Sequence, residues 1–184
     1  MDVRLIIQAR QGSVRFPNKW KADINGTYAI DYVIDAVKHS KYYNITNLYF
    51  VIPKQDDELI EYITDKGINV VNDKDRNVYQ GFVDIGGDIQ ARITGDSPCI
   101  DPEQIDVNID KVIEGYEYAS NEITTFGNCA EAFTWAALNK YKPEHGGDKE
   151  HATLALRRNS LKRWLPSLMI DYEENLETVA KWLK

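Results

Sequence analysis

Short runs of apolar residues alternate along the chain with longer stretches in which apolar residues recur every three or four positions. The clearest of these stretches carries Ile30, Val33, Ile34 and Val37, at the i, i+3, i+4 and i+7 spacing that places side chains on one face of a helix. The short runs have the length of buried strands. This alternation predicts an α/β fold, a three-layer, mostly parallel mixed sheet with helices on both faces.

The pattern can be divided into elements with definite bounds. We predict strands at residues 3–9, 48–52, 69–71, 89–94 and 116–120, and helices at residues 30–39, 58–66, 102–114, 149–159 and 173–183. A chain of 184 residues has the usual length of one domain, so we expect a single domain over residues 1–184.

The first predicted strand ends in a loop suited to bind anions. This loop carries two small residues, Gly12 and Ser13, and three cations, Arg10, Arg15 and Lys19. Backbone N–H groups can approach an anion closely at a glycine, and the cations can neutralise it, so the loop is a candidate polyphosphate site. It has no Gly-Lys-Ser/Thr sequence opening a helix and is therefore not a Walker A loop. A basic surface loop remains an equal alternative at this point.

A second motif, at residues 91–102, combines a short strand, Gly95, Asp96 and a turn bounded by prolines. Ligands on open α/β sheets bind beyond the carboxyl ends of the strands, so Asp96 is expected to face the same crevice as the cationic loop. A carboxylate facing a triphosphate implies a divalent cation, typically Mg²⁺. The alternative role, an N-cap for the helix that follows, suits Asp101 before Pro102 better than it suits Asp96.

Charge and composition narrow the class of ligand. The chain has 29 acidic and 22 basic residues, a formal net charge of −7, which argues against nucleic acid but not against a single nucleotide. Cys99 and Cys129, the two cysteines, are expected to be small buried side chains rather than a disulfide or zinc framework. With no signal peptide and no apolar run of about 20 residues, we expect a cytoplasmic protein without membrane insertion.

The two motifs together resemble the cytidylyltransferases of surface-polysaccharide synthesis. Residues 6–19, followed by Ile24-Asn25-Gly26, look like the opening of the spore-coat polysaccharide type, which is related to acylneuraminate and keto-deoxy-octulosonate cytidylyltransferases. Residues 92–102 resemble the second signature of that family. Shorter matches at residues 118–121, 131–133, 150–153 and 170–175 follow in the same order, so the resemblance covers nearly the whole chain.

The resemblance implies that a sugar hydroxyl attacks the α-phosphorus of CTP and that pyrophosphate leaves. It assigns catalysis to Arg10, Lys19 and Asp96, and nucleotide binding to Ala9, Arg10, Gly12, Ser13, Arg15 and Lys19. It also implies Mg²⁺ held by Asp96 and Asp171, although Asp171 could equally serve as the N-cap of the last predicted helix.

The resemblance places the sugar on the side of Asn121 and Glu131. The alternatives are that Asn121 simply ends a strand and that Glu131 is a surface residue of a strand. His151 matches a helical motif of the family and receives no chemical role, because a lone helical histidine is more often structural.

The resemblance implies that residues 116–160 form a dimerisation and sugar-side subregion of a homodimer, because relatives pair through this part of the chain. An apparent excess of apolar surface supports this, contributed by Phe126, Phe133, Trp135, Leu154 and Leu156. Two-fold interfaces are the commonest way to bury such a surface. The alternative is that these side chains pack internally in a monomer.

The chain departs from the family at Gly81, where the family has an arginine lining the nucleotide pocket, and at Gln80, where it has an acid. The helix leading to residues 84–88 is also shortened. Two alternatives therefore stay open: a nucleotide-binding relative with reduced or no activity, and a glycosyltransferase using Asp73-Lys74-Asp75 as its metal motif. The sequence does not name the sugar.

Overall fold

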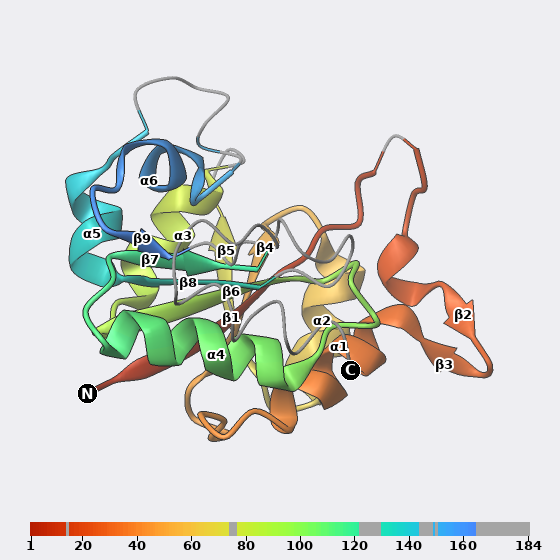
Figure 1. Cartoon of the computed structure of the whole chain (residues 1–184). Helices are drawn as coiled ribbons and strands as arrows, with labels where there is room; N and C mark the ends of the chain where they lie inside the picture. Colours follow the sequence, from red (N-terminus) through yellow and green to blue (C-terminus); the bar gives the residue numbers. More distant parts are fainter. Residues whose placement is uncertain (14, 74–76, 122–129, 144–148, 150, 165–184) are drawn as a thin grey trace.

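A computed structural model describes residues 1–13, 15–73, 77–121, 130–143, 149 and 151–164. Within this part of the chain, the strands form one seven-stranded sheet of order β5-β4-β1-β6-β8-β7-β9 and a separate hairpin of β2 and β3 (Figure 1). The sheet strands are β1 Val3–Gln8, β4 Leu48–Pro53, β5 Asn69–Asp73, β6 Ile89–Thr94, β7 Tyr118–Ser120, β8 Ala130–Thr134 and β9 Arg163–Trp164, and the hairpin strands are β2 Asp23–Ile24 and β3 Thr27–Tyr28.

The sheet is mixed and mostly parallel, as predicted. Strands β5, β4, β1 and β6 run parallel to one another, β8 pairs antiparallel with both β6 and β7, and β9 pairs parallel with β7. The carboxyl ends of β1 and β6 therefore lie side by side, with Gln8 paired to Thr94.

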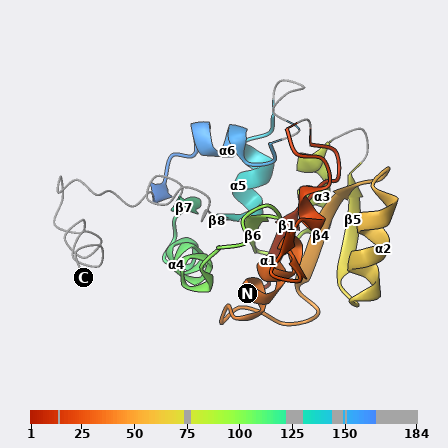
Figure 2. The same cartoon turned by 90° about the vertical axis from the view of Figure 1, so that its right-hand side faces the viewer.

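Helices cover both faces of the sheet, which confirms the three layers (Figures 1 and 2). The helices are α1 Ala29–Lys38, α2 Asp57–Asp65, α3 Val78–Ile85, α4 Pro102–Ile113, α5 Trp135–Lys140, α6 Leu154–Asn159 and the short 3₁₀ helix η1 Lys19–Lys21. Helices α1, α2 and α4 lie on one face, and α3, α5 and α6 lie on the other.

The alternation of side chains along β1 creates the two cores. Leu5 and Ile7 point to the face covered by α1, α2 and α4, and Ile6 between them points to the face of α3, α5 and α6. All three side chains are fully buried, so a strand with an unbroken apolar run serves both layers.

Most predicted elements agree with the structure to within two residues. The helix expected at 149–159 is shorter, because α6 begins only at Leu154. Elements α3, α5 and β8 were not among those predicted, and the helix expected at 173–183 lies outside the described residues.

Two features of the turn after β6 can be compared with expectation. The side chain of Asp101 accepts a hydrogen bond from Glu103 N at 2.9 Å and caps α4, as predicted. The thiol of Cys99 is exposed, so the prediction of a buried cysteine is wrong there: the residue lies on the outside of the turn between Ser97 and Ile100. Cys129 lies outside the described residues.

The predicted apolar surface is buried in part, and Leu154 within it is half-buried. Phe133 and Leu156 are fully buried within the chain itself, where Phe133 packs against Phe82 with ring centroids 6.2 Å apart. The expectation that these two residues need a second subunit to cover them is therefore wrong. Trp135 is 36% exposed, and Phe126 lies outside the described residues. The homodimer itself stays a prediction.

Among the described residues, no helix is both long and apolar enough to span a bilayer.

Candidate active site

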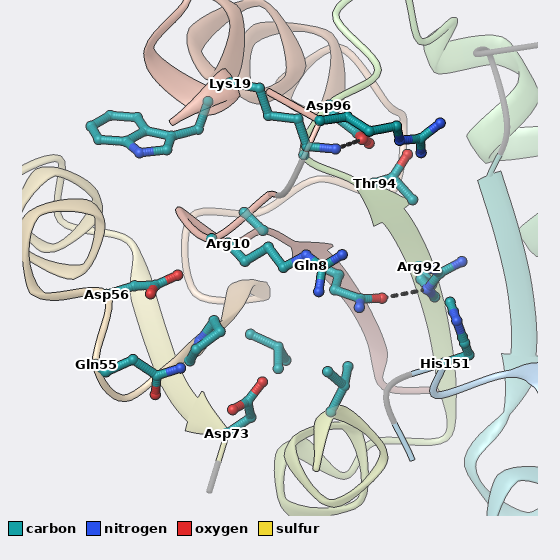
Figure 3. Close-up of a pocket in the computed structure, with 18 residues that line it drawn as sticks. Gln8, Arg10, Lys19, Gln55, Asp56, Asp73, Arg92, Thr94, Asp96 and His151 are labelled. Carbon is teal, nitrogen blue, oxygen red and sulfur yellow. Dashed lines mark hydrogen bonds and ion pairs between the residues drawn. The ribbon is translucent and has the colours of Figure 1, made fainter. Parts of the chain in front are cut away.

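A cavity of about 320 Å³ opens at the carboxyl ends of β1, β4 and β6 (Figure 3). Most of the site residues predicted from the sequence line this cavity. Its lining includes Ala9, Arg10, Gly12, Arg15, Lys19 and Asp96. The loop after β1 and the turn after β6 thus meet in one site, as expected from their positions at neighbouring strand ends.

Gly95 makes this meeting possible. A Cβ atom at this position would lie 2.8 Å from Ala9 Cβ and 3.2 Å from Gln8 O, closer than the packing allows. The backbone of Gly95 instead donates a hydrogen bond to Gln8 O at 2.8 Å. The turn that carries Asp96 is therefore held directly against the start of the cationic loop.

The cationic loop is folded around Gln11. Gln11 O accepts hydrogen bonds from Ser13 N and Asn18 N, both at 3.0 Å, and Asn18 has a left-handed backbone with φ of 56°. Gln11 N donates to the buried carboxylate of Asp56 at 2.6 Å, which ties the loop to the start of α2. Ser13 is not among the lining residues, and its hydroxyl accepts from Phe16 N at 3.4 Å.

Lys19 and Asp96 form an ion pair at the mouth of the cavity. Partial burial alone would raise the pKa of the Asp96 carboxyl, but the hydrogen bond and charge of Lys19 outweigh it and lower the pKa below its usual value. Asp96 is therefore a carboxylate at neutral pH. Two of the three predicted catalytic residues contact each other, and Arg10 lines the same cavity (Figure 3).

A second cavity of about 400 Å³ adjoins the first. The two share Arg92, Thr94 and His151, and the second adds Glu131, Thr153, Leu154 and Arg157. The shared residues are the dividing wall, which is built mainly from β6. The sequence could have identified this wall, because polar and apolar residues alternate along β6. Arg92 and Thr94 lie on the face opposite to the buried Ala91 and Ile93.

Glu131 lies in β8 and is buried, so the alternative of a surface residue is wrong. Its carboxylate accepts hydrogen bonds from Arg92 Nη1, from Tyr118 Oη at 2.5 Å and from Thr153 Oγ1 at 3.0 Å. Burial raises the pKa of such a group, but the Arg92 charge and these donors lower it overall. The pKa of Tyr118 is shifted in the other direction: burial and the negative charge of Glu131 both raise it.

The other predicted sugar-side residue lines neither cavity. Asn121 is fully buried, and its side-chain oxygen accepts from Ala130 N at 2.9 Å and from Asn108 Nδ2 at 3.2 Å. These contacts hold the start of β8 against α4. A contact between Asn121 and a sugar stays a prediction. Asp171 lies outside the described residues.

Position 81 faces the sheet. Gly81 lies in α3, and a Cβ atom there would stand only 2.9 Å from Val51 Cγ1. Val51 lines the first cavity, whereas Gly81 does not. The close approach of α3 to β4 therefore requires a glycine, and the cavity wall here is Val51 and Val78 rather than an arginine.

Other lining residues carried no role in the sequence analysis. They are Gln8, Gln55, Asp56 and Thr94 in addition to Arg92 and His151. Asp73, the first residue of the alternative metal motif, also lines the cavity and is buried, while Lys74 and Asp75 lie outside the described residues.

Comparison with known proteins places this arrangement in a family. Residues 5–173 match the cytidylyltransferase family. The chain is 28% identical over 170 residues to the spore coat polysaccharide biosynthesis protein SpsF of Bacillus subtilis, covering 86% of this chain and 71% of that protein.

Solved structures agree with the fold. A cytidylyltransferase from Leptospira borgpetersenii superposes with a TM-score of 0.81 at 26% identity, covering 97% of this chain and 85% of that one. CMP:2-keto-3-deoxy-manno-octonic acid synthetase in complex with CTP has a TM-score of 0.67 at 16% identity, covering 100% and 98%, and shows the likeness of fold alone. The family match spans most of the chain and confirms the enzyme class that the two motifs implied: this protein belongs to the cytidylyltransferase family of CTP-dependent nucleotidyltransferases.

Proposed function

We propose that this protein transfers CMP from CTP to a sugar, with release of pyrophosphate, in the synthesis of a surface glycan. The observation that carries the proposal is the shared cavity of the cationic loop and Asp96, at the adjoining carboxyl ends of β1 and β6. Such a cavity offers cations for a triphosphate and a carboxylate for its metal ion.

The predicted site residues have separate roles in this reaction. Arg10, Arg15 and Lys19 bind the triphosphate, and Lys19 neutralises the charge that develops on the leaving pyrophosphate. The backbone N–H of Gly12 adds a hydrogen-bond donor for the nucleotide. Those of Ala9 and Ser13 already donate to Val51 O and Gln11 O, so these two residues are assigned only to the shape of the nucleotide site. The attacking sugar hydroxyl would approach from the second cavity, because the two cavities meet at Arg92 and Thr94.

The residues present fit a magnesium ion. The described residues contain no group of three or more histidine, cysteine or acidic side chains suited to hold a metal by themselves. Magnesium in nucleotide sites needs only one or two carboxylates together with phosphate oxygens. Asp96 supplies one such carboxylate, and Asp171 is proposed as the second. When bound, Mg²⁺ would neutralise and orient the triphosphate.

The sugar is proposed to be acidic. Arg92, Arg157 and His151 line the second cavity, and Glu131, the one carboxylate among its described lining residues, is paired with Arg92. Similar proteins include an 8-amino-3,8-dideoxy-manno-octulosonate cytidylyltransferase from Shewanella piezotolerans, 31% identical over 127 residues. Those residues cover 64% of this chain and 48% of that enzyme. The cytoplasmic location also stays a prediction.

Pyrophosphate release tests the proposal. The protein is incubated with CTP, Mg²⁺ and a panel of neutral and acidic sugars, and we expect release that depends on one class of sugar. A glycosyltransferase would release no pyrophosphate under these conditions, because its donor is a sugar already joined to a nucleotide. A binding protein without activity would bind CTP in calorimetry and release nothing with any sugar.

A further inference from the structure

Arg92 stands in the wall between the two cavities with its guanidinium held in place. Its side chain is 15% exposed and lines both cavities, next to His151 (Figure 3). Nε donates to Gln8 Oε1 at 2.8 Å, and Nη1 donates to Glu131. A guanidinium has five N–H donors, and among the described residues no hydrogen bond involves Nη2.

Glu131 is fully engaged within the protein. Its Oε1 accepts from Tyr118 and Thr153, its Oε2 accepts from Arg92 and Thr153, and its side chain is only 3% exposed. A carboxylate with this many donors has little capacity left for a sugar hydroxyl. Its negative charge and the positive charge of Arg92 neutralise each other, so the pair adds no net charge to the second cavity.

Among the described lining residues of the second cavity, Arg157 is the charged side chain outside this pair. Arg157 from α6 and Arg92 from β6 line it together with His151, and Glu131 is the only acid among its described lining residues. A guanidinium that lines both cavities and is held in place by Gln8 and Glu131 is suited to hold an oxyanion.

We infer that Arg92 binds an oxyanion of the substrates where the two cavities meet, and that Glu131 is a positioning residue that acts through Arg92 rather than a sugar ligand. The inference rests on the proposed cytidylyl transfer. The oxyanion comes from one of two sources with the same chemistry: the α-phosphate of the nucleotide or an acidic group of the acceptor sugar.

The test compares Arg92→Lys, Glu131→Gln and the double variant with the wild-type protein. Lysine keeps the charge but cannot bond to Gln8, Glu131 and a ligand in one plane. Glutamine keeps the shape of Glu131 and removes its charge. Glu117→Gln is the matched control, because Glu117 also has three donors, Lys140, Tyr141 and Leu161 N, but lines neither cavity. Its calorimetric and kinetic constants should equal those of the wild type.

Two measurements distinguish the source of the oxyanion. Calorimetry with CMP, which holds only the α-phosphate, should show about a tenfold weaker affinity in Arg92→Lys if that phosphate is the ligand. If the sugar supplies the oxyanion, CMP affinity stays unchanged and the KM for the sugar rises by about tenfold instead. In both cases Glu131→Gln gives a smaller change of the same kind, and the double variant is no worse than Arg92→Lys alone.

Two results would overturn the inference. The first is that Arg92→Lys keeps its CMP affinity, its kcat and its KM for the sugar within about twofold of the wild-type values. The other is a full effect of Glu131→Gln in the Arg92→Lys background, which would make Glu131 a direct ligand. Should Glu131→Gln fail to fold, Tyr118→Phe replaces it, since it removes one donor to the same carboxylate.

Failure of the proposed cytidylyl transfer can be distinguished from failure of the role assigned to Arg92. If the wild-type protein binds CMP but releases no pyrophosphate with any sugar, the transfer reaction is wrong and the CMP measurement alone decides the role of Arg92. If the wild-type protein binds neither CMP nor inorganic pyrophosphate, both proposals fail.

Discussion

At the scale of single residues, Asp96 is the side chain whose replacement should lower the rate of the proposed reaction most. It is a carboxylate that lines the cavity and pairs with Lys19. Replacing Asp96 by Asn removes one charge and keeps the shape of the side chain. We expect pyrophosphate release to fall by about 10²-fold or more, because the carboxylate that holds the metal is lost. The melting temperature should change little.

The matched control for this change is Asp101→Asn, five residues further along the same turn. Asp101 caps α4, and asparagine is an equally good N-cap, so neither activity nor stability should change. Unchanged kinetics in Asp96→Asn would instead assign Asp96 to the structure of the turn.

Lys19 lies opposite Asp96 and is assigned to the leaving pyrophosphate. In Lys19→Ala we expect kcat to fall while the KM for CTP changes little, because the lost contact matters most in the transition state. Lys21→Ala is the control, since Lys21 bonds to Glu58 at 2.6 Å and does not line the cavity. A rise in KM alone would make Lys19 a ground-state anchor for phosphate.

At the scale of elements, the fit of α3 against β4 depends on Gly81. An alanine would normally favour a helix by about 1 kcal/mol over glycine. Here its Cβ would lie 2.9 Å from Val51 Cγ1, on a stiff, branched side chain that cannot turn away easily. We therefore expect Gly81→Ala to lower the free energy of unfolding by about 1–3 kcal/mol, measured by urea denaturation.

The cause can be isolated with Val51→Ala, which removes the atom that clashes. In that background Gly81→Ala should be neutral or stabilising, because only the helix propensity remains. An equal loss in both backgrounds would show that the contact with Val51 is not responsible.

Glu117 joins β7, α5 and the segment that leads to β9. It accepts hydrogen bonds from Lys140 Nζ at 2.9 Å, Tyr141 Oη at 3.0 Å and Leu161 N at 3.2 Å. The Lys140 hydrogen bond and the other donors hold the pKa of this carboxyl below its usual value. A depressed pKa means that the stabilisation is present at neutral pH and is lost as the pH falls through the pKa of the folded state.

Glu117→Gln should therefore lower stability by about 1 kcal/mol at pH 7, and the difference from the wild type should shrink on acidification. Thermal melts between neutral and acidic pH measure it. Glu114→Gln is the control, because its pair with Lys111 is an exposed contact that contributes little. A difference that is independent of pH would exclude the charge of Glu117 as the cause.

The elements also show what local sequence can and cannot predict. The first strand carries an apolar run that is buried on both faces, and its bounds follow from that run alone. Strand β8 has only five residues and carries the charged Glu131 at its second position, which hides its apolar pattern. Glu131 is buried there only because Arg92, Tyr118 and Thr153 arrive from other elements, and no local pattern contains such long-range partners.

Local pattern and long-range contact also separate the site residues that the sequence predicts from those that it misses. Arg10, Arg15 and Lys19 lie in the segment after β1, and Asp96 lies in the turn after β6, so strand topology could place all four at one crevice. His151 and Thr153 reach the cavities from the segment before α6, and Asp56 does so from the start of α2. Their roles depend on tertiary packing.

At the scale of the whole molecule, CTP and Mg²⁺ should stabilise the fold, since they would join the loop after β1 to the turn after β6. A ligand that binds only the folded state at about 100 times its Kd adds about 2.7 kcal/mol. For a domain of this size, that corresponds to a rise in melting temperature of about 5–10 °C. We expect this rise with CTP and Mg²⁺, a smaller one with ATP, GTP or UTP, and little with CTP in the presence of EDTA.

The four nucleotides share their triphosphate, so any preference for CTP must come from the cavity wall that contacts the base. We propose that Val51 and Val78 form this wall, with no arginine at position 81, and therefore expect a modest preference. Asp96→Asn serves as the control, because its shift with CTP should no longer depend on Mg²⁺. Equal shifts with all four nucleotides would mean that the cavity binds only the triphosphate, and no shift with any of them would contradict nucleotide binding at this site.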